Sequence, residues 1–440
     1  MRRTRYLVTL TLILTSLFVF AGAASADPPS PQDADPHTQN IHDMGHDRAP
    51  ASLFYGPPDI HTDIAFWGQY AIQGNWTGFR ILDISAPGNP KLISYTECNG
   101  NQGDVVVWQN IVVRSWNSPA LGTTSCGGQT VPAGFEGLHV FDISNVNSPV
   151  LLAAVNLSNG AIPGRCGSHT ATGVPDPANN RLLIYNSGSQ CDGIDIVEVP
   201  LNNPAAAAFL RLEPAGRNCH DTSVILGDAM LAACAGGNGY TMWRLNSGAL
   251  EDPELLYSRS IPGVTIGHSG SFSWDGRVFV FGHEPGGGVG ASCEASDPIT
   301  DRSFFFFEAA NGNQLGMWTL PRPQTALENC TLHNFNVVPL RSGRYVIAHG
   351  SYQSGTSIVD FTDPANAFEV GYSDPPPIVP QDLGGAWSTY WYNNFLYETN
   401  ITEGLNILLL SDSARAGAMR LPYLNPQTQD FTIAAPGKRK

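Results

Sequence analysis

Charged side chains are scarce in this chain of 440 residues, where Asp, Glu, Lys and Arg together make up only 14%. Basic residues are the scarcer kind, with 23 Lys and Arg against 38 Asp and Glu, so the formal net charge is −15. Such a surface repels the phosphates of nucleic acids and the headgroups of anionic lipids. We therefore expect no nucleic-acid partner and no membrane partner.

Long apolar runs are also lacking, apart from one at residues 7–20. This run is shorter than the roughly 20 residues that a membrane-spanning helix needs. Basic residues precede it and the small residues Ala24-Ser25-Ala26 follow it, which is the pattern of a secretory signal. The sequence therefore predicts a signal peptide at residues 1–26 and a secreted, extracellular protein.

Apolar periodicity is absent from residues 27–50, which are polar and rich in proline. This composition is typical of a segment that does not fold on its own, so we predict a flexible leader here. The segment carries His37, His42 and His46, which offer a loose metal site as the alternative interpretation.

No long segment shows the period of a helix, whereas one four-part pattern recurs from about residue 52 to about residue 425. Each of its seven copies has four short apolar runs separated by turn-forming residues, and the first copy reads HTDIAFWG, YAIQGNW, GFRILDIS and PKLISYTE. One such sheet cannot bury both faces, but sheets stacked radially around an axis can. We therefore predict an all-β fold over residues 51–440, a single seven-bladed β-propeller of four-stranded antiparallel blades.

The third run of several copies carries a family resemblance. FRILDIS (79–85), LHVFDIS (138–144) and SIVDFTDP (357–364) resemble the LVIVD repeat of secreted bacterial β-propellers. The resemblance implies the architecture and brings no catalytic residues with it. Asp83 and Asp142 are best interpreted as turn formers, whose side chains bind backbone groups after the strand.

Aligning the copies places histidine at the start of most first runs. In a propeller these runs line the central channel, so equivalent positions converge on one mouth. Histidine occupies five of the seven positions, although the chain has only 11 histidines. The aligned residues are His61, Asp104, His169, His220, His268, His333 and Trp387.

These histidines have two interpretations. Each imidazole can cap a neighbouring loop, in which case duplication has copied a structural residue. Alternatively, neutral imidazoles that converge on an axis can hold a divalent transition metal such as copper, manganese, iron or zinc. The second interpretation makes five residues candidate metal ligands, namely His61, His169, His220, His268 and His333.

Three further residues are candidates for catalysis at the same mouth. Asp104 is a candidate carboxylate ligand or base. Glu284 ends the second run FGHE (281–284), where it can orient the inner imidazoles together with His283 and His349. Arg217 precedes a first run and can meet an anionic substrate, or it is a solvated loop charge.

None of the eight cysteines lies in a CxxC pair, which disfavours a zinc knuckle or a thioredoxin-like motif. In an exported chain they predict disulfides. The loops that bear them emerge on the histidine face, and sequential pairing keeps every loop short. The predicted pairs are Cys98–Cys126, Cys166–Cys191, Cys219–Cys234 and Cys293–Cys330.

Two functions remain open from the sequence. One is a metal-dependent enzyme of the lyase or oxidoreductase type, acting on a small molecule or a glycan at the histidine-lined mouth. The other is a binding or scaffold propeller that catalyses nothing. We expect a monomer in either case, because closed propellers are often monomers.

Overall fold

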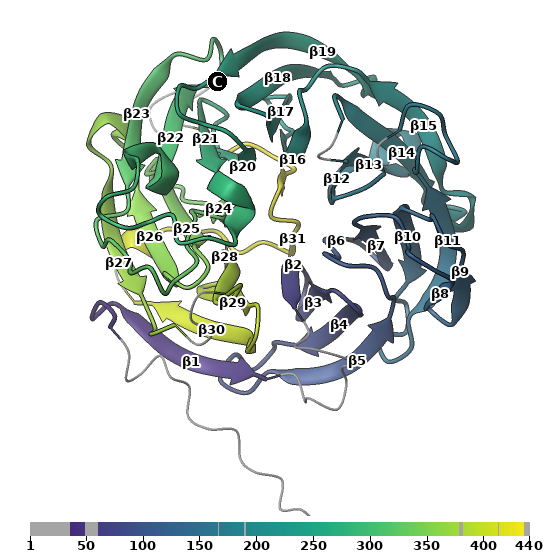
Figure 1. The fold of residues 1–440 in the computed structure, drawn as a ribbon, viewed down its shortest axis with the longest axis horizontal. Helices are drawn as coiled ribbons and strands as arrows, with labels where there is room; N and C mark the ends of the chain where they lie inside the picture. The colour runs from purple at the N-terminus through teal and green to yellow at the C-terminus, as the bar shows by residue number, and fades with distance from the viewer. Residues whose placement is uncertain are drawn as a thin grey trace, which may run out of the picture.

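Short β-strands make up nearly all of the regular structure and are grouped into sheets around a central axis (Figure 1). Figure 1 shows the computed structural model, which describes residues 36–48, 60–165, 167–188, 191–377, 382–411 and 413–434. The predicted signal peptide lies outside these residues. Short 3-10 helices interrupt the strands at η3 (Pro177–Asn179), η4 (Pro204–Ala206), η5 (Pro285–Gly288), η6 (Ile299–Arg302), η7 (Pro364–Asn366) and η8 (Ser413–Arg415).

Three sheets consist of four antiparallel strands each. The first contains β6 (Val105–Trp108), β7 (Ile111–Trp116), β10 (Gly137–Asp142) and β11 (Val150–Asn156). The second contains β12 (Thr170–Asp176), β13 (Arg181–Ser187), β14 (Ile194–Pro200) and β15 (Ala208–Glu213). The third contains β20 (Gly267–Phe272), β21 (Val278–His283), β22 (Ser303–Glu308) and β23 (Gln314–Thr319).

Two further sheets add a short C-terminal strand to the same four-stranded unit. One contains β2 (His61–Trp67), β3 (Tyr70–Asn75), β4 (Gly78–Asp83), β5 (Lys91–Glu97) and β31 (Tyr423–Leu424). The other contains β16 (Cys219–Ile225), β17 (Leu231–Gly236), β18 (Gly239–Asn246), β19 (Ala249–Ser260) and β32 (Thr428–Gln429).

The remaining strands form one eight-stranded sheet and a small hairpin. The eight strands are β24 (Asn334–Val337), β25 (Val346–Gly350), β26 (Thr356–Asp360), β27 (Phe368–Ser373), β28 (Ala386–Tyr392), β29 (Phe395–Asn400), β30 (Gly404–Leu410) and β1 (Ile41–Asp47). The hairpin pairs β8 (Thr124–Cys126) with β9 (Gln129–Val131). The radial sheets confirm the predicted all-β propeller fold, with each sequence copy running from an inner strand to an outer one.

The segment 27–50 is not a flexible leader throughout, since β1 lies within it. This strand pairs antiparallel with β30 from Ile41↔Leu410 to Asp47↔Leu405. Ile41 is only 2% exposed, and the Asp47 carboxylate binds the buried guanidinium of Arg80 at 2.5 Å. The sequence prediction failed here because β1 has little apolar character of its own and is held by the partner strand.

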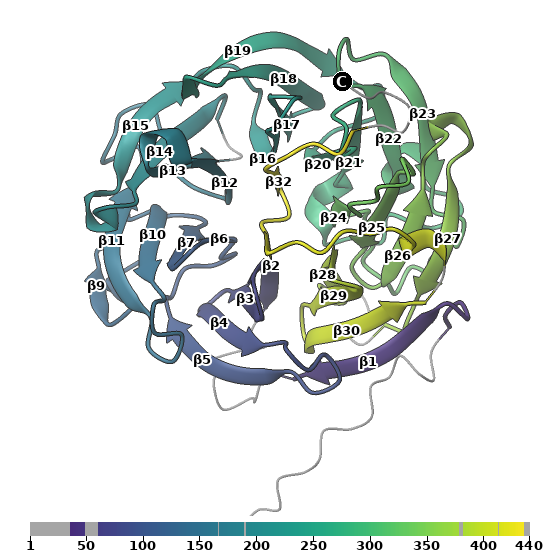
Figure 2. The same ribbon diagram turned by 180° about the vertical axis from the view of Figure 1, so that it is seen from behind.

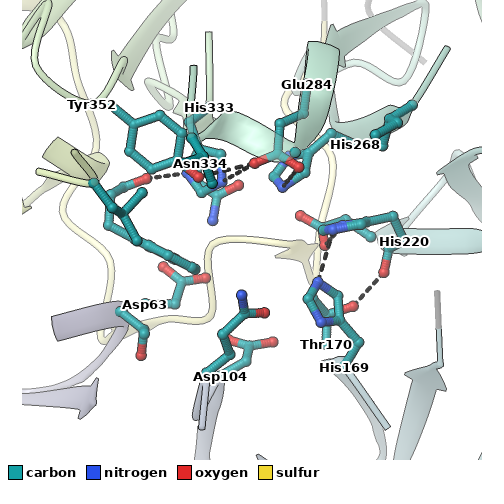
Figure 3. Close-up of a pocket in the computed structure, with 18 of the residues that line it drawn as sticks. Asp63, Asp104, His169, Thr170, His220, His268, Glu284, His333, Asn334 and Tyr352 are labelled. Atoms are coloured by element: carbon teal, nitrogen blue, oxygen red, sulfur yellow. Dashed lines mark hydrogen bonds and ion pairs between the residues drawn. The ribbon is translucent and has the colours of Figure 1, made fainter. Parts of the chain in front are cut away.

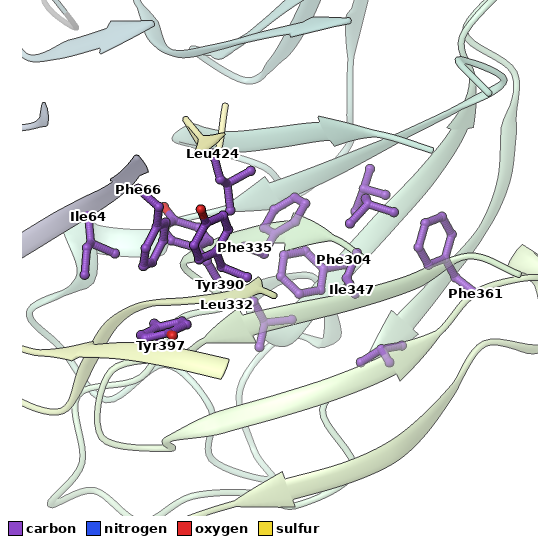
Figure 4. Close-up of a cluster of buried hydrophobic side chains, with 14 of the residues drawn as sticks. Ile64, Phe66, Phe304, Leu332, Phe335, Ile347, Phe361, Tyr390, Tyr397 and Leu424 are labelled. Atoms are coloured by element: carbon purple, nitrogen blue, oxygen red, sulfur yellow. The ribbon is translucent and has the colours of Figure 1, made fainter. Parts of the chain in front are cut away.

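The apolar core lies between neighbouring sheets. Figure 4 shows part of the largest cluster, in which the ring of Phe66 packs against that of Tyr397, and the ring of Phe304 against that of Phe335, each pair joining two neighbouring units. Phe306 and Phe361 stack with centroids 4.9 Å apart. Burying apolar faces against the next unit is the physical reason for closing the ring.

The C-terminal segment crosses the central channel at the ends of the inner strands (Figure 2). Asn425 binds both backbone groups of Val107, with Nδ2 donating to the carbonyl and Oδ1 accepting from the N–H, each at 2.8 Å. Thr428 Oγ1 donates to the Gly173 carbonyl at 2.7 Å, and Gln429 Nε2 donates to the Phe272 carbonyl at 2.9 Å. The segment therefore closes one end of the channel.

Disulfides join three of the predicted cysteine pairs, which confirms those pairs: Cys98–Cys126, Cys219–Cys234 and Cys293–Cys330. The fourth predicted pair involves Cys166, which lies outside the described residues. Disulfides are typical of oxidising compartments. Within the described ranges, no helix has the length and apolar character needed to cross a bilayer.

The LVIVD-like segments end as expected. Oδ1 of Asp83 accepts the N–H of Ser85, and Oδ1 of Asp142 accepts the N–H of Ser144, each at 2.8 Å. Both aspartates therefore form turns after the third strand of their unit, which confirms the structural interpretation of this motif.

Candidate functional site

A cavity of about 560 Å³ occupies the open end of the channel, where the inner strands begin. We call it the axial cavity. Side chains from several inner strands point into it, as Figure 3 shows for His169, His220 and His333. Four of the five predicted histidines line it, namely His169, His220, His268 and His333.

β-Bulges at the start of inner strands aim these side chains. In β16 the pairing moves from Cys219↔Gly236 to Asp221↔Ala235, which leaves His220 unpaired between them. In β20 a similar shift follows Gly267, directly before His268. A bulge turns a side chain away from the regular strand face, here towards the axis.

His61 is not among the residues that line the axial cavity. It pairs with Asn75 ahead of the bulge in β2, as Cys219 pairs with Gly236 ahead of the bulge in β16. The residue of β2 equivalent to His220 is therefore Thr62, which does line the cavity. The sequence alignment of this copy was therefore wrong by one residue, because it placed His61 where Thr62 lies.

The four cavity histidines form a continuous arc. Ring centroids are 4.2 Å apart for His169 and His220, 4.1 Å for His220 and His268, and 4.3 Å for His268 and His333. Burial lowers the pKa of both His169 and His268 well below the ordinary value. These two imidazoles are therefore neutral near pH 7, as metal ligands must be.

Glu284 faces the end of this arc. Its Oε2 lies 3.7 Å from His268 Nε2 and its Oε1 lies 3.5 Å from His333 Nε2. Burial alone would raise the pKa of Glu284, but His268 and His333 outweigh it and hold the pKa well below its ordinary value. The Tyr352 hydroxyl donates to Oε1 at 2.9 Å and fixes the carboxylate.

The hydrogen bonds of His333 define its protonation pattern. Nδ1 contacts the carbonyl oxygen of Trp387, so it must carry a proton and donate it. Nε2 is buried and faces Glu284, whose Oε1 lies 3.5 Å away at the outer limit of a hydrogen bond. A neutral His333 thus turns a lone pair towards a carboxylate, which is repulsive. A metal ion between them, or a second proton on the ring, relieves the repulsion.

His268, Glu284 and His333 also have the right spacing for a metal. Their ligand atoms lie within 4.8 Å of one another, as do those of His220, Asp221 and His268. Ligands about 2.0–2.1 Å from a tetrahedral ion lie about 3.4 Å from each other. The 3.5 and 3.7 Å contacts of Glu284 are close to that separation.

His220 is oriented by the adjacent carboxylate. Its Nδ1 donates to Asp221 Oδ1 at 3.0 Å, and its Nε2 lies 2.8 Å from Nε2 of His169. Burial lowers the pKa of His220, but the hydrogen bond and charge of Asp221 outweigh burial and raise it. The pair can therefore exchange a proton through one short N···N contact.

Asp104 lines the axial cavity, one residue deeper than the sequence alignment placed it. Its Oδ1 accepts the N–H of the next residue, Val105, as Oδ1 of Asp63 does with Ile64. This shared contact aligns Asp104 with Asp63 rather than with the histidines. Burial raises the pKa of Asp104 well above its ordinary value, and like charge on Asp63 and Asp221 raises it further.

Arg217 is exposed and is not among the cavity-lining residues. Glu284 itself enters the cavity, whereas its two predicted companions do not. His283 accepts a hydrogen bond from the Thr265 N–H, and His349 packs between the rings of Phe304 and Trp318. The predicted outer shell around the imidazoles is thus reduced to Glu284.

Sequence reasoning missed several cavity residues, including Asp63, Asn334, Tyr352, Trp76 and Gln427. Asp63 carried a signal, because it follows His61 at the distance at which Asp221 follows Cys219. No sequence pattern pointed to Tyr352 or Gln427. Tyr352 comes from a loop and Gln427 from the C-terminal segment, and both lie outside the repeat.

The model of the LVIVD repeat family matches residues 61–96 and 133–156. The chain carries LVIVD repeats. No curated protein matches the sequence. Among solved structures, a Lactobacillus plantarum protein is similar to this LVIVD-repeat propeller with a TM-score of 0.54, over 85% of this chain and 97% of that one at 11% identity. Kuenenia stuttgartiensis hydrazine synthase is similar with a TM-score of 0.52, over 78% and 93% at 10% identity. At these identities the likeness shows the fold alone.

Proposed function

We propose that this LVIVD-repeat propeller binds a divalent transition metal through His268, Glu284 and His333, and that it is a metal-dependent enzyme acting on a small molecule or a glycan in the axial cavity. The observation that carries the proposal is the convergence of the ligand atoms of His268, Glu284 and His333 to within 4.8 Å of one another, with Nε2 of His333 buried and 3.5 Å from the Glu284 carboxylate. Two imidazoles and one carboxylate suit zinc, iron, copper or manganese.

The open side of this ligand set faces the cavity, so a substrate atom can reach the metal. The metal supplies Lewis-acid or redox chemistry when bound. His220 then accepts or returns a proton at Nε2, while Asp221 holds its Nδ1–H in place. The C-terminal segment closes the far end of the channel and limits the water that reaches the site. These roles fit a lyase or an oxidoreductase.

We also infer a count of seven blades. The eight-stranded sheet contains two sequence copies, and its inner strands β24 and β28 touch in parallel over two residue pairs only, Asn334↔Ser388 and Phe335↔Thr389. Within each copy the strands pair antiparallel over longer stretches. Counting this sheet as two blades beside the five separate sheets gives seven. The predicted signal peptide and the three disulfides support secretion.

Metal analysis of protein purified without a histidine tag tests the metal proposal. We expect about one equivalent of a transition metal, and a loss of affinity of at least about a hundredfold in Glu284→Gln and His333→Ala. His42→Ala is the control, because His42 lies on β1 outside the axial cavity. Circular dichroism of each variant shows that it is folded.

A wild-type protein that binds less than about a tenth of an equivalent of each of the four metals overturns the proposal. Equal binding by wild type and Glu284→Gln overturns it too. A metal-free protein leaves the second function considered, a propeller that only binds a partner or ligand.

A further inference from the structure

The side of the axial cavity away from the proposed metal ligands is rich in hydrogen-bond acceptors. In Figure 3, Asp63 and Asp104 lie across the cavity from Glu284 and His268. Four carboxylates line the cavity, and none of the described lining residues is Lys or Arg. They are Asp63, Asp104, Asp221 and Glu284. An anionic ligand is therefore disfavoured in the cavity.

Two amide oxygens in the same lining have no partner. Oδ1 of Asn334 is buried without a hydrogen bond, and Asn334 as a whole is 7% exposed. Oε1 of Gln102 is likewise buried and unpartnered. Buried acceptors of this kind are costly unless a donor meets them. Both oxygens therefore call for N–H or O–H groups on a bound molecule.

The donors of the lining are largely committed already. The hydroxyl of Thr62 donates to the Gly103 carbonyl at 3.0 Å, and the side-chain amide of Gln427 donates to Asp63 at 2.7 Å. Tyr352 donates to Glu284. Trp76 Nε1 is an exception, a buried donor without a partner, which a hydroxyl or carbonyl oxygen on the same molecule would satisfy.

Aromatic rings complete the site. The ring of His333 lies 4.4 Å from that of Tyr352 and 4.9 Å from that of Trp387, and both of these rings line the cavity. Aromatic faces attract cations, most strongly where water is excluded. Like charge on Asp63 and Asp221 raises the pKa of Asp104, and a cation bound beside these carboxylates offsets that repulsion.

We propose that the axial cavity selects a small organic ammonium cation, with its N–H groups on Asp104, Asn334 and Gln102 and its carbon skeleton against Trp387 and Tyr352. The inference rests on the proposed function in treating this cavity as the place where substrate binds. It does not require that the metal be present, because the acceptors named here are separate from His268, Glu284 and His333.

Calorimetry with three probes of nearly equal shape tests the charge preference. Benzylamine is a cation near neutral pH, benzyl alcohol is neutral and benzoate is an anion. With chelator-treated wild-type protein we expect benzylamine to bind at least about tenfold more tightly than benzyl alcohol, and benzoate not to bind. Binding of benzoate, or equal affinity for the amine and the alcohol, overturns the inference.

Asp104→Asn locates the preference. This variant should weaken benzylamine binding at least about fivefold and leave benzyl alcohol within about twofold. Asp360→Asn is the matched control, because Asp360 is also buried but binds Arg344 outside the cavity. Equal loss in both variants, or no loss in Asp104→Asn, contradicts the assignment.

The two proposals can fail separately. Selective binding of benzylamine by a protein that takes up no metal supports the cation site and removes the metal. Metal binding with no preference among the three probes supports the metal site and removes the cation site.

Discussion

Replacing Asn425 by alanine should destabilise the propeller by loosening the segment that closes its channel. Asn425 is 3% exposed and makes two hydrogen bonds of 2.8 Å to Val107, which is fully buried. Val107 lies in β6, the innermost strand of its sheet. The backbone N–H and C=O of Val107 that face the central channel therefore have no neighbouring strand. The Asn425 side chain takes the place of that missing strand.

The magnitude follows from the groups left behind. Asn425→Ala removes both partners and leaves a buried N–H and a buried C=O unpaired, at about 1–3 kcal/mol each. We therefore expect the free energy of unfolding to fall by about 2–6 kcal/mol, with the lower end holding if water enters the channel. Urea unfolding followed by tryptophan fluorescence measures the change.

Hydrogen exchange at the Val107 amide gives a second, local readout. This amide should exchange slowly in the wild type and much faster in the variant. Asn147→Ala is the control, because Asn147 lies in an exposed turn and should change stability by less than about 0.5 kcal/mol. An Asn425→Ala protein within that margin of the wild type, with Val107 still protected, would refute the reasoning.

Two further predictions concern Gly74 in β3 and Asp104 directly before β6. Gly74→Ala places a Cβ 1.9 Å from the Gly103 carbonyl oxygen, so it should cost about 2 kcal/mol or more in urea unfolding, whereas Gly122→Ala meets nothing within 4 Å and should cost under about 0.5 kcal/mol. Equal stability of the two variants contradicts this. Asp104 keeps its proton to higher pH when folded than when unfolded, so its contribution to stability is full below about pH 4 and is lost as pH rises through the folded pKa. Asp104→Asn should therefore gain stability relative to the wild type as pH rises above about 4, and a pH-independent difference would count against it.

The propeller could be predicted from the sequence because several copies of the repeat end a strand with the same kind of turn. Asp83 and Asp142 end equivalent strands with the same turn, and a spacing of this kind survives divergence of the apolar residues. β1 escaped prediction for the opposite reason. Its pairing energy comes from β30, more than 350 residues away in the chain, and no local pattern reports such a partner.

The histidine alignment was right in outline and wrong by one residue at two places. Sequence runs place a strand to within a residue or two, but a bulge decides which of two neighbours faces the axis. In β2 that choice turns Thr62 inward, and in the next sheet it puts Asp104 beside the aspartates. The bulge depends on hydrogen bonding between strands, which a single sequence does not display.

The hydrogen bonds between inner strands bear on the two interpretations of the histidines. A histidine whose role is to cap a neighbouring loop should donate a hydrogen bond to the backbone of the next inner strand. That contact is made instead by small hydroxyl side chains, such as Thr170 on the His220 carbonyl and Ser269 on the His333 carbonyl. The rings of His220 and His268 are thereby released from capping. His333 alone binds a neighbouring backbone carbonyl through Nδ1, and this contact turns its other nitrogen towards Glu284.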